Sequence, residues 1–120
     1  MQREAAAFLW DAHEAAGLIR EFVSGRNFET FSASALICSA VERQFEIIGE
    51  ALNRLSKIAP EIAGQIPELA QIVGFRNVLI HGYAVLDKTV VWKVIQEDLG
   101  PLEEAVRRLL AKSPPPDATS

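Results

Sequence analysis

The chain has 120 residues, of which 49% are hydrophobic, and this length and composition are typical of one compact domain with a buried core. A net charge of −4 argues against a general nucleic-acid binder, which normally presents a basic surface, so any contact with RNA should be confined to a local cleft. The sequence has no apolar run as long as a membrane span and no signal-peptide pattern at its start, so a soluble, cytoplasmic protein is expected.

Two long helices are predicted in the first half of the chain, over residues 3–24 and 32–57. The first has apolar residues at spacings of three and four: Ala5, Phe8, Ala12, Ala15, Ile19 and Phe22. The second has a similar series: Ile37, Val41, Phe45, Ile48, Leu52 and Leu55. Both series are close to a heptad repeat, which favours antiparallel packing in a helical bundle.

The second predicted helix also carries three acidic residues and a glycine. Three glutamates recur at four-residue intervals beside its apolar face: Glu42, Glu46 and Glu50. Like charges at this spacing repel, so they are either balanced on a solvated face by Arg43 and Arg54, or one of them is the buried partner of Arg76. Gly49 costs a helix about 1 kcal/mol relative to alanine, which suggests that another helix approaches closely there.

A third helix is predicted with Pro67 in its first turn, a position that proline suits. Its apolar residues lie at helical spacing: Leu69, Ile72, Val73, Leu79 and Ile80. At about 100° per residue, Arg76 falls within about 60° of all of them, so its guanidinium should face a core or an interface. An isolated buried charge is costly, so Arg76 should pair with a carboxylate of a neighbouring helix or with a bound anion, unless its stem carries the charge to the surface.

His81 follows Arg76 by five positions, or about 140° on an ideal helix, too far for both side chains of one chain to reach one small ligand. Gly82 favours the left-handed conformation just past a helix end, so the helix should end near His81, and Asn77 could orient the imidazole. Arginine fits a phosphate and histidine can move a proton near neutral pH. From spacing alone, however, a histidine at a helix end is more often a cap or a surface residue than a catalyst.

The last predicted helix covers residues 88–112, with Asp87 as its N-cap, and Pro101 should kink or divide it near Gly100. No stretch alternates polar and apolar residues as a strand would. The predicted fold is therefore all-α, an up-and-down bundle of four main helices in a single domain over residues 1–112. The tail, residues 113–120 (SPPPDATS), has little to bury and should be disordered.

No metal or cofactor site is predicted. The two histidines and the single cysteine show no metal-ligand spacing, and the seven glycines form no phosphate-binding loop. Cys38, within the apolar stretch SALICSAV, should be a small core residue in a reducing compartment, and His13 should be a solvated surface residue. If the protein is an enzyme, its chemistry should depend on Arg76 and His81 without a metal or a cofactor.

Residues 76–83, RNVLIHGY, have the form R-x-x-x-x-H-x-Y with an asparagine after the arginine. This pattern resembles the signature of the HEPN superfamily, and specifically of its HepT-like toxins. Flanking blocks of similar character extend the resemblance over most of residues 10–110: DAHEAAGLIREFVSGRNFETF, VERQFEIIGEA, GFRNVLIHGY and VVWKVIQEDLGPL. The arginine–histidine pair alone is weak, but with Asn77, Tyr83 and these blocks the pattern is specific, and the chain departs from it at none of the four motif residues.

The resemblance implies a HEPN-like bundle and a metal-independent endoribonuclease toxin. It implies a homodimer or larger assembly in which the motif helices of two subunits line one cleft and bind RNA. His81 would exchange protons with the ribose 2′-hydroxyl or the leaving 5′-oxygen, Arg76 would stabilise the charged phosphorane, and Asn77 would support them. The product would carry a 2′,3′-cyclic phosphate.

The resemblance also implies a partner, a minimal nucleotidyltransferase antitoxin, with Tyr83 as the acceptor of the adenylyl groups that it adds. A nucleotide on Tyr83 would place negative charge and bulk beside Arg76 and exclude RNA. From the sequence, Tyr83 also suits a half-buried aromatic residue that closes the helix end. Two other classes are compatible with the sequence: a non-catalytic module that binds nucleotides or a nucleotidyltransferase, and a structural helical protein in which Arg76 bridges subunits.

Overall fold

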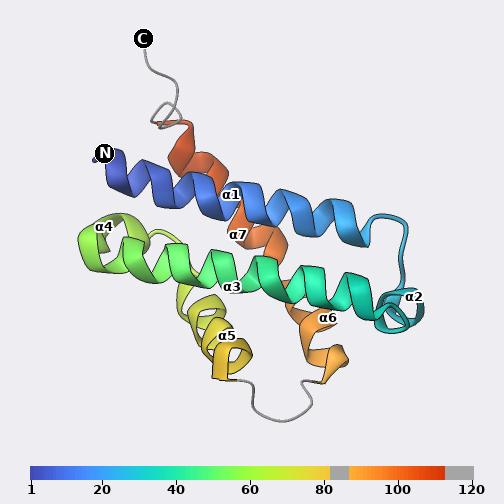
Figure 1. The fold of residues 1–120 in the computed structure, drawn as a ribbon. Coiled ribbons are helices and arrows are strands. Elements are labelled where there is room, and N and C mark those ends of the chain that lie inside the picture. The colour runs from blue at the N-terminus through green and yellow to red at the C-terminus, as the bar shows by residue number, and fades with distance from the viewer. Residues whose placement is uncertain (82–86, 113–120) are drawn as a thin grey trace.

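The computed structural model describes residues 1–81 and 87–112. Within these ranges every regular element is a helix, which confirms the all-α prediction. The helices are α1 (Arg3–Val23), α2 (Phe28–Ser32), α3 (Ala35–Ile58), α4 (Pro60–Ala63), α5 (Leu69–His81), α6 (Lys88–Glu97) and α7 (Leu99–Leu110) (Figure 1). No helix in the described ranges is both long enough and apolar enough to cross a membrane.

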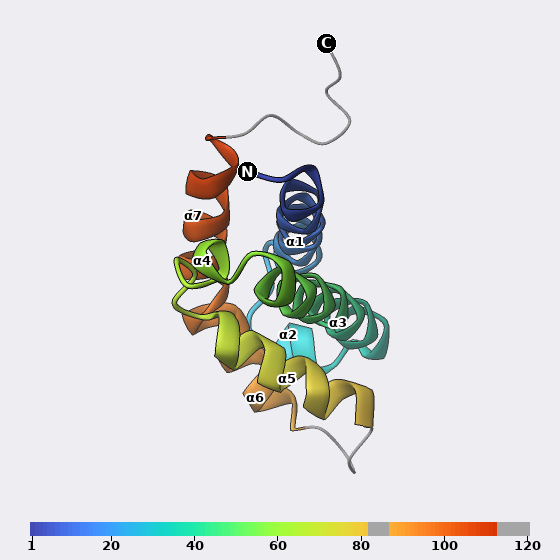
Figure 2. The same ribbon diagram turned by 90° about the vertical axis from the view of Figure 1, so that its left-hand side faces the viewer.

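The two long helices, α1 and α3, lie side by side and antiparallel, and their contact is the most extensive in the fold. Figures 1 and 2 show α3 between α1 and α5, so α3 contributes to two helix interfaces. The second of these interfaces, between α3 and α5, positions the predicted motif. Helix α7 also packs against α1.

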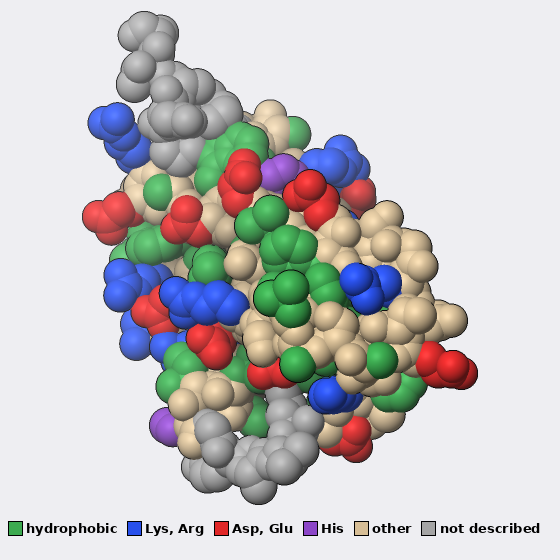
Figure 3. Space-filling view, turned by 45° about the vertical axis from the view of Figure 1, so that its right-hand side comes forward, with side chains coloured by type: hydrophobic (Ala, Val, Ile, Leu, Met, Phe, Trp, Pro, Cys, Tyr) green, Lys and Arg blue, Asp and Glu red, His purple; other side chains and the backbone are tan. Residues whose placement is uncertain are grey.

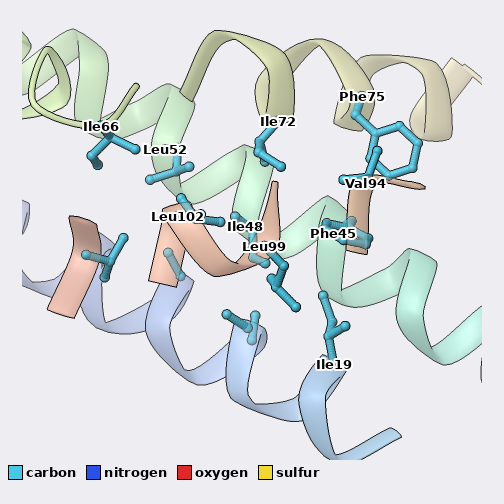
Figure 4. Packing of buried hydrophobic residues seen from close by; sticks show 14 of the residues in the cluster. Ile19, Phe45, Ile48, Leu52, Ile66, Ile72, Phe75, Val94, Leu99 and Leu102 are labelled. Atoms are coloured by element: carbon cyan, nitrogen blue, oxygen red, sulfur yellow. The ribbon is translucent and has the colours of Figure 1, made fainter. Parts of the chain in front are cut away.

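The interface between α3 and α5 is apolar at its centre. Ile72 of α5 is fully buried, and Phe75 of α5 meets Phe45 of α3 edge to face, with ring centroids 5.3 Å apart. Figure 4 shows Ile72 and Phe75 pointing toward α3 and the C-terminal helices. Burying side chains of this size contributes about 1.5–3 kcal/mol each, so this contact fixes the side of α5 that faces α3.

Short capping sequences explain where several helices begin. Asn27 and Thr30 form a capping box that starts α2, and the Ser34 hydroxyl accepts a hydrogen bond from the backbone at the start of α3. Asp87 accepts a hydrogen bond from the backbone N–H of Thr89 at 2.9 Å, which confirms it as the N-cap of α6. Helix α1 ends within one residue of its predicted boundary.

Other boundaries differ from the predictions. The second long helix begins three residues later than predicted because residues 28–32 form a separate helix, α2, and α4 was not predicted at all. Pro67 lies two residues before α5 and not in its first turn. The last segment does divide, as predicted, but at Asp98; Pro101 then falls in the first turn of α7, where its missing N–H costs no helical hydrogen bond. The predicted tail, residues 113–120, lies outside the described residues.

Candidate functional site

Arg76 lies on the side of α5 that faces α3, as its phase with the apolar residues predicted. Its side chain is only 22% exposed. The stem passes directly over Gly49 of α3: a methyl group built on Gly49 would overlap the Cβ of Arg76 and lie 2.6 Å from its Cγ. The glycine therefore permits the close helix contact that its position in the sequence suggested, and this contact seats the arginine.

Glu50 of α3 is the partner of Arg76. Its Oε2 accepts a hydrogen bond from Nη2 of Arg76, and its Oε1 accepts one from Nε of Arg54 at 2.8 Å. A glutamate of α3 thus pairs with Arg76, as one interpretation proposed, but Glu50 is not buried: its side chain is 38% exposed, and Arg54 of the same helix also balances its charge. Glu46 is balanced locally by Arg43 on the same helix at 3.1 Å, as the other interpretation proposed, although its side chain is only 27% exposed.

The carboxylate of Glu50 is held in its charged form. The hydrogen bond from Arg54, together with the positive charge of Arg76, holds the pKa of Glu50 below its ordinary value. Glu42, eight residues earlier on α3, shows the opposite effect: burial, and then the negative charge of Glu46, raise its pKa. Arg54 and Arg76 therefore lower the pKa of Glu50, whereas the pKa of Glu42 on the same helix is raised.

The guanidinium of Arg76 is held at several points. Nη1 donates a hydrogen bond to Oδ1 of Asn77 at 2.9 Å, while Nη2 donates to Glu50. Nε is buried and has no hydrogen-bond partner among the described residues. The structure thus brings Asn77 together with Arg76, and a planar cation fixed in this way is well suited to bind an anionic oxygen that replaces one of these partners.

Arg76 borders a cleft of about 470 Å³ that lies between α1, α3 and α5. We refer to it as the α1–α3–α5 cleft. Each of the three helices contributes both charged and apolar groups to its walls: Phe8 and Asp11 from α1, Arg43, Glu46, Ile47, Glu50, Ala51 and Arg54 from α3, and Arg76 and Ile80 from α5. Figure 3 shows acidic and basic side chains intermingled over one face, with no continuous basic area. The cleft follows the same mixed pattern, since its three arginines lie among three carboxylates, those of Asp11, Glu46 and Glu50.

His81 occupies the last turn of α5 and is exposed. This agrees with the predicted position at the helix end. It is not among the described residues that line the α1–α3–α5 cleft, because it lies about 100° around the helix from Ile80, which does. Ile80 itself corrects the sequence prediction: it is 49% exposed and borders the cleft instead of joining the core. The positions of Gly82 and Tyr83 lie outside the described residues.

Cys38 and His13 were predicted to lie outside the functional site, one in the core and the other on the surface. Cys38 is buried, as predicted, and its Sγ donates to the backbone oxygen of Phe31 at 3.3 Å. His13 is half-buried and packs edge-on against Trp10 with ring centroids 5.0 Å apart, so it is less solvated than predicted. In residues 1–81 and 87–112, no three histidine, cysteine, aspartate or glutamate side chains are grouped to hold a metal ion.

The part of this site that sequence reasoning missed is Arg54. It was considered only as a charge that could balance a glutamate, because a four-residue spacing between acid and base on one helix is common at solvated faces. Its place beside Arg76 depends on how α5 crosses α3, and no local pattern encodes that crossing. The close approach at Gly49, directly before Glu50, was the only indirect signal.

An all-α domain with an arginine seated in a cleft and a histidine at the end of the same helix has the arrangement expected of the HEPN superfamily. The model of the family described as Ribonuclease HepT-like matches residues 12–109. The chain therefore belongs to the HepT-like ribonuclease family.

Several curated proteins are similar along nearly their whole length. A protein named "Probable ribonuclease HepT" from Thermococcus cleftensis is 35% identical over 111 residues, which cover 91% of this chain and 98% of the relative. A "Putative RNase" from Methanocaldococcus jannaschii is 34% identical over 105 residues, covering 88% and 95%. Another "Putative RNase", from Caldanaerobacter subterraneus, is 35% identical over 92 residues, covering 77% and 81%. No solved structure matches the chain significantly.

Proposed function

We propose that this protein is a metal-independent endoribonuclease toxin in which Arg76 and His81 act on the RNA phosphodiester. The observation that carries the proposal is the anchoring of Arg76 by Glu50 and Asn77 at the edge of a cleft, with His81 one and a half turns further along α5. The names of the relatives, "Putative RNase" and "Probable ribonuclease HepT", support a ribonuclease activity.

The proposed reaction uses the substrate's own nucleophile. The ribose 2′-oxygen attacks the adjacent phosphorus and loses its proton, and the bond to the 5′-oxygen breaks as that oxygen gains a proton. The products are a 2′,3′-cyclic phosphate and a 5′-hydroxyl. His81 moves a proton at one of these two oxygens, and Arg76 stabilises the additional negative charge of the phosphorane. Neither task needs a metal or a cofactor.

The experiment that tests the proposed function is incubation of the purified protein, free of any partner, with single-stranded RNA in the presence and absence of a chelator. Cleavage at equal rates in both samples is the expected result. A protein that binds the RNA without cutting it would instead be a non-catalytic binding module.

The angle between the two residues favours a composite site. Within one α5 the side chains of Arg76 and His81 diverge by about 140°, and only Arg76 borders the α1–α3–α5 cleft. Two copies of α5 brought together would let Arg76 of one subunit and His81 of the other approach the same phosphate. The exposed apolar side chains of Val78 and Ile80 on α5 fit such an association.

A dimer or larger assembly is therefore expected in solution. Light scattering coupled to size-exclusion chromatography should give a mass of at least twice 13.2 kDa at micromolar concentration. Replacing Ile80 with glutamate would place a charge in the proposed interface and should shift the mass toward the monomer. If the parent protein is a monomer, a site formed by Arg76 of one subunit and His81 of another is ruled out.

Control by a separate minimal nucleotidyltransferase antitoxin is the second part of the proposal. Tyr83 follows His81 by two positions and is the candidate acceptor. An adenylyl group there would add negative charge and bulk close to the motif, and this would repel the RNA backbone. The support for this step is the family motif in the sequence.

Protein produced together with its nucleotidyltransferase should carry one or more AMP groups on Tyr83. Intact-mass and peptide mass spectrometry should locate the added mass, and Tyr83→Phe should prevent it. If the co-produced protein is inactive but its Tyr83 peptide is unmodified, inhibition occurs by simple binding and this step of the proposal is wrong.

A further inference from the structure

A second arginine shares the carboxylate that holds Arg76. Glu50 accepts from Arg54 through one oxygen and from Arg76 through the other, so the two guanidinium groups lie on either side of a single carboxylate. One negative charge between two positive charges leaves this group of three residues with a net charge of +1. Of the other charged groups that line the α1–α3–α5 cleft, Arg43 pairs with Glu46, and Asp11 adds a negative charge, so the cleft as a whole is neutral. The positive charge that could attract an anion is therefore local to the guanidinium groups of Arg54 and Arg76.

Arg54 has hydrogen-bond donors that no described residue accepts from. Its guanidinium carries five N–H groups, and the hydrogen bond to Glu50 uses only the one on Nε. Its terminal nitrogens have no other partner among the described residues, and the side chain is 62% exposed, compared with 22% for Arg76. An arginine that is oriented at Nε and open at its terminal nitrogens presents the planar pair of donors that binds a phosphate.

The cleft beside Arg54 also has apolar surface. Phe8 from α1 and Ile47 from α3 line it together with Ile80 from α5. Its volume of about 470 Å³ lies in the range of sites that hold small ligands. An aromatic side chain can stack on a base of a single-stranded nucleic acid while neighbouring arginines contact its backbone, and Phe8 and Arg54 line the same cleft.

We propose that Arg54 is a second phosphate-contacting residue of the RNA site, and that Glu50 is a positioning residue that aligns it with Arg76. Arg54 binds a phosphate of the RNA strand next to the one held at Arg76, and the attached nucleotide lies in the α1–α3–α5 cleft. This assignment rests on the proposed ribonuclease function, because it takes a single RNA strand as the ligand.

The test compares Arg54→Ala with a matched control, Arg107→Ala. Arg107 lies on α7, is 64% exposed and pairs with Glu104 on its own helix, so its replacement removes a similar charge and a similar exposed ion pair outside the cleft. Two readouts are needed. The first is fluorescence anisotropy with a non-cleavable, single-stranded 2′-O-methyl oligonucleotide at several salt concentrations, and the second is steady-state cleavage of the matching RNA.

Arg54→Ala should raise both Kd and KM about tenfold, with kcat nearly unchanged. It should also lower the slope of log K against log salt by about 0.7, the value for one lost phosphate contact on a single strand. Arg54→Lys, which keeps the charge but not the paired donors, should fall between parent and Arg54→Ala. Arg107→Ala should bind and cleave like the parent.

Equal oligonucleotide binding by Arg54→Ala and Arg107→Ala would overturn the inference, as would a parent protein that does not bind the oligonucleotide. A drop in kcat with unchanged KM and salt slope would also overturn it, because Arg54 would then act only through the orientation of Arg76. If the parent binds but does not cleave RNA, the proposed function fails, while the binding data still decide the role of Arg54.

Discussion

Replacing either Arg76 or His81 with alanine is expected to abolish RNA cleavage while leaving the helical fold intact. A positioned general acid or base contributes about 10²–10⁴-fold to the rate, and a charge that stabilises the transition state contributes about 10²–10³-fold. Each single variant should therefore lose at least about a hundredfold in kcat. Initial rates on a fixed RNA, measured in chelator, would show the loss, and circular dichroism would show that the helices remain.

The matched control for His81→Ala is His13→Ala, which removes the other histidine, on α1, and should cleave RNA at the parental rate. Parental activity in the Arg76 or the His81 variant would show that the residue concerned has been assigned wrongly. A loss that occurs only in chelated samples would instead indicate a metal site that contributes to the reaction.

Replacing Gly49 with alanine should destabilise the protein and disturb the seating of Arg76. Alanine is favoured over glycine by about 1 kcal/mol in a helix, but the added methyl group overlaps the Cβ of Arg76, an atom fixed by the backbone of α5. Overpacking of this kind typically costs about 1–3 kcal/mol, and the clash should exceed the gain in helix propensity. Helices α3 and α5 must separate, which weakens the hydrogen bond between Arg76 and Glu50.

Gly17→Ala on α1 is the control for this effect. Gly17 is helical and exposed, and an added methyl group would meet nothing within 4 Å, so this variant should gain up to about 1 kcal/mol of stability. Urea unfolding of both variants gives the comparison, and RNA cleavage should fall only in Gly49→Ala. Equal stabilisation by the two substitutions would mean that α3 and α5 do not approach as closely as described.

The sequence predicted those parts of the fold that have a strong local signal. The apolar periodicities of α1 and α3 gave both helices, and the carboxylate of Asp87 marked the start of α6. Helix α2 was missed because a five-residue helix is too short to show a period, and the Asn27 capping box was not recognised. The last segment was predicted to break near Gly100, but the break lies at Asp98. Pro101 therefore lies in the first turn of α7, where a helix tolerates proline.

The sequence predicted the site residue on α5, Arg76, but it could not single out its partner on α3. The phase of Arg76 showed that it faces a neighbouring helix, and the glycine at position 49 indicated where a helix comes close. The choice of Glu50 among three equivalent glutamates depends on the crossing of α5 over α3, which no local spacing contains. The exposure of Ile80 also depends on this crossing, because Ile80 is 49% exposed and lines the cleft between α1, α3 and α5. Tyr83 lies outside the described residues, so its role stays a prediction.

The most direct test of the ribonuclease proposal is an analysis of the ends of RNA cut by the purified, partner-free protein in the presence of a chelator. The proposed reaction gives upstream fragments that end in a 2′,3′-cyclic phosphate and downstream fragments that begin with a 5′-hydroxyl. It also requires that a matched strand without the 2′-hydroxyl at the cut position stays uncut. Fragments with 5′-phosphate ends, or cleavage of the strand without that hydroxyl, would contradict it.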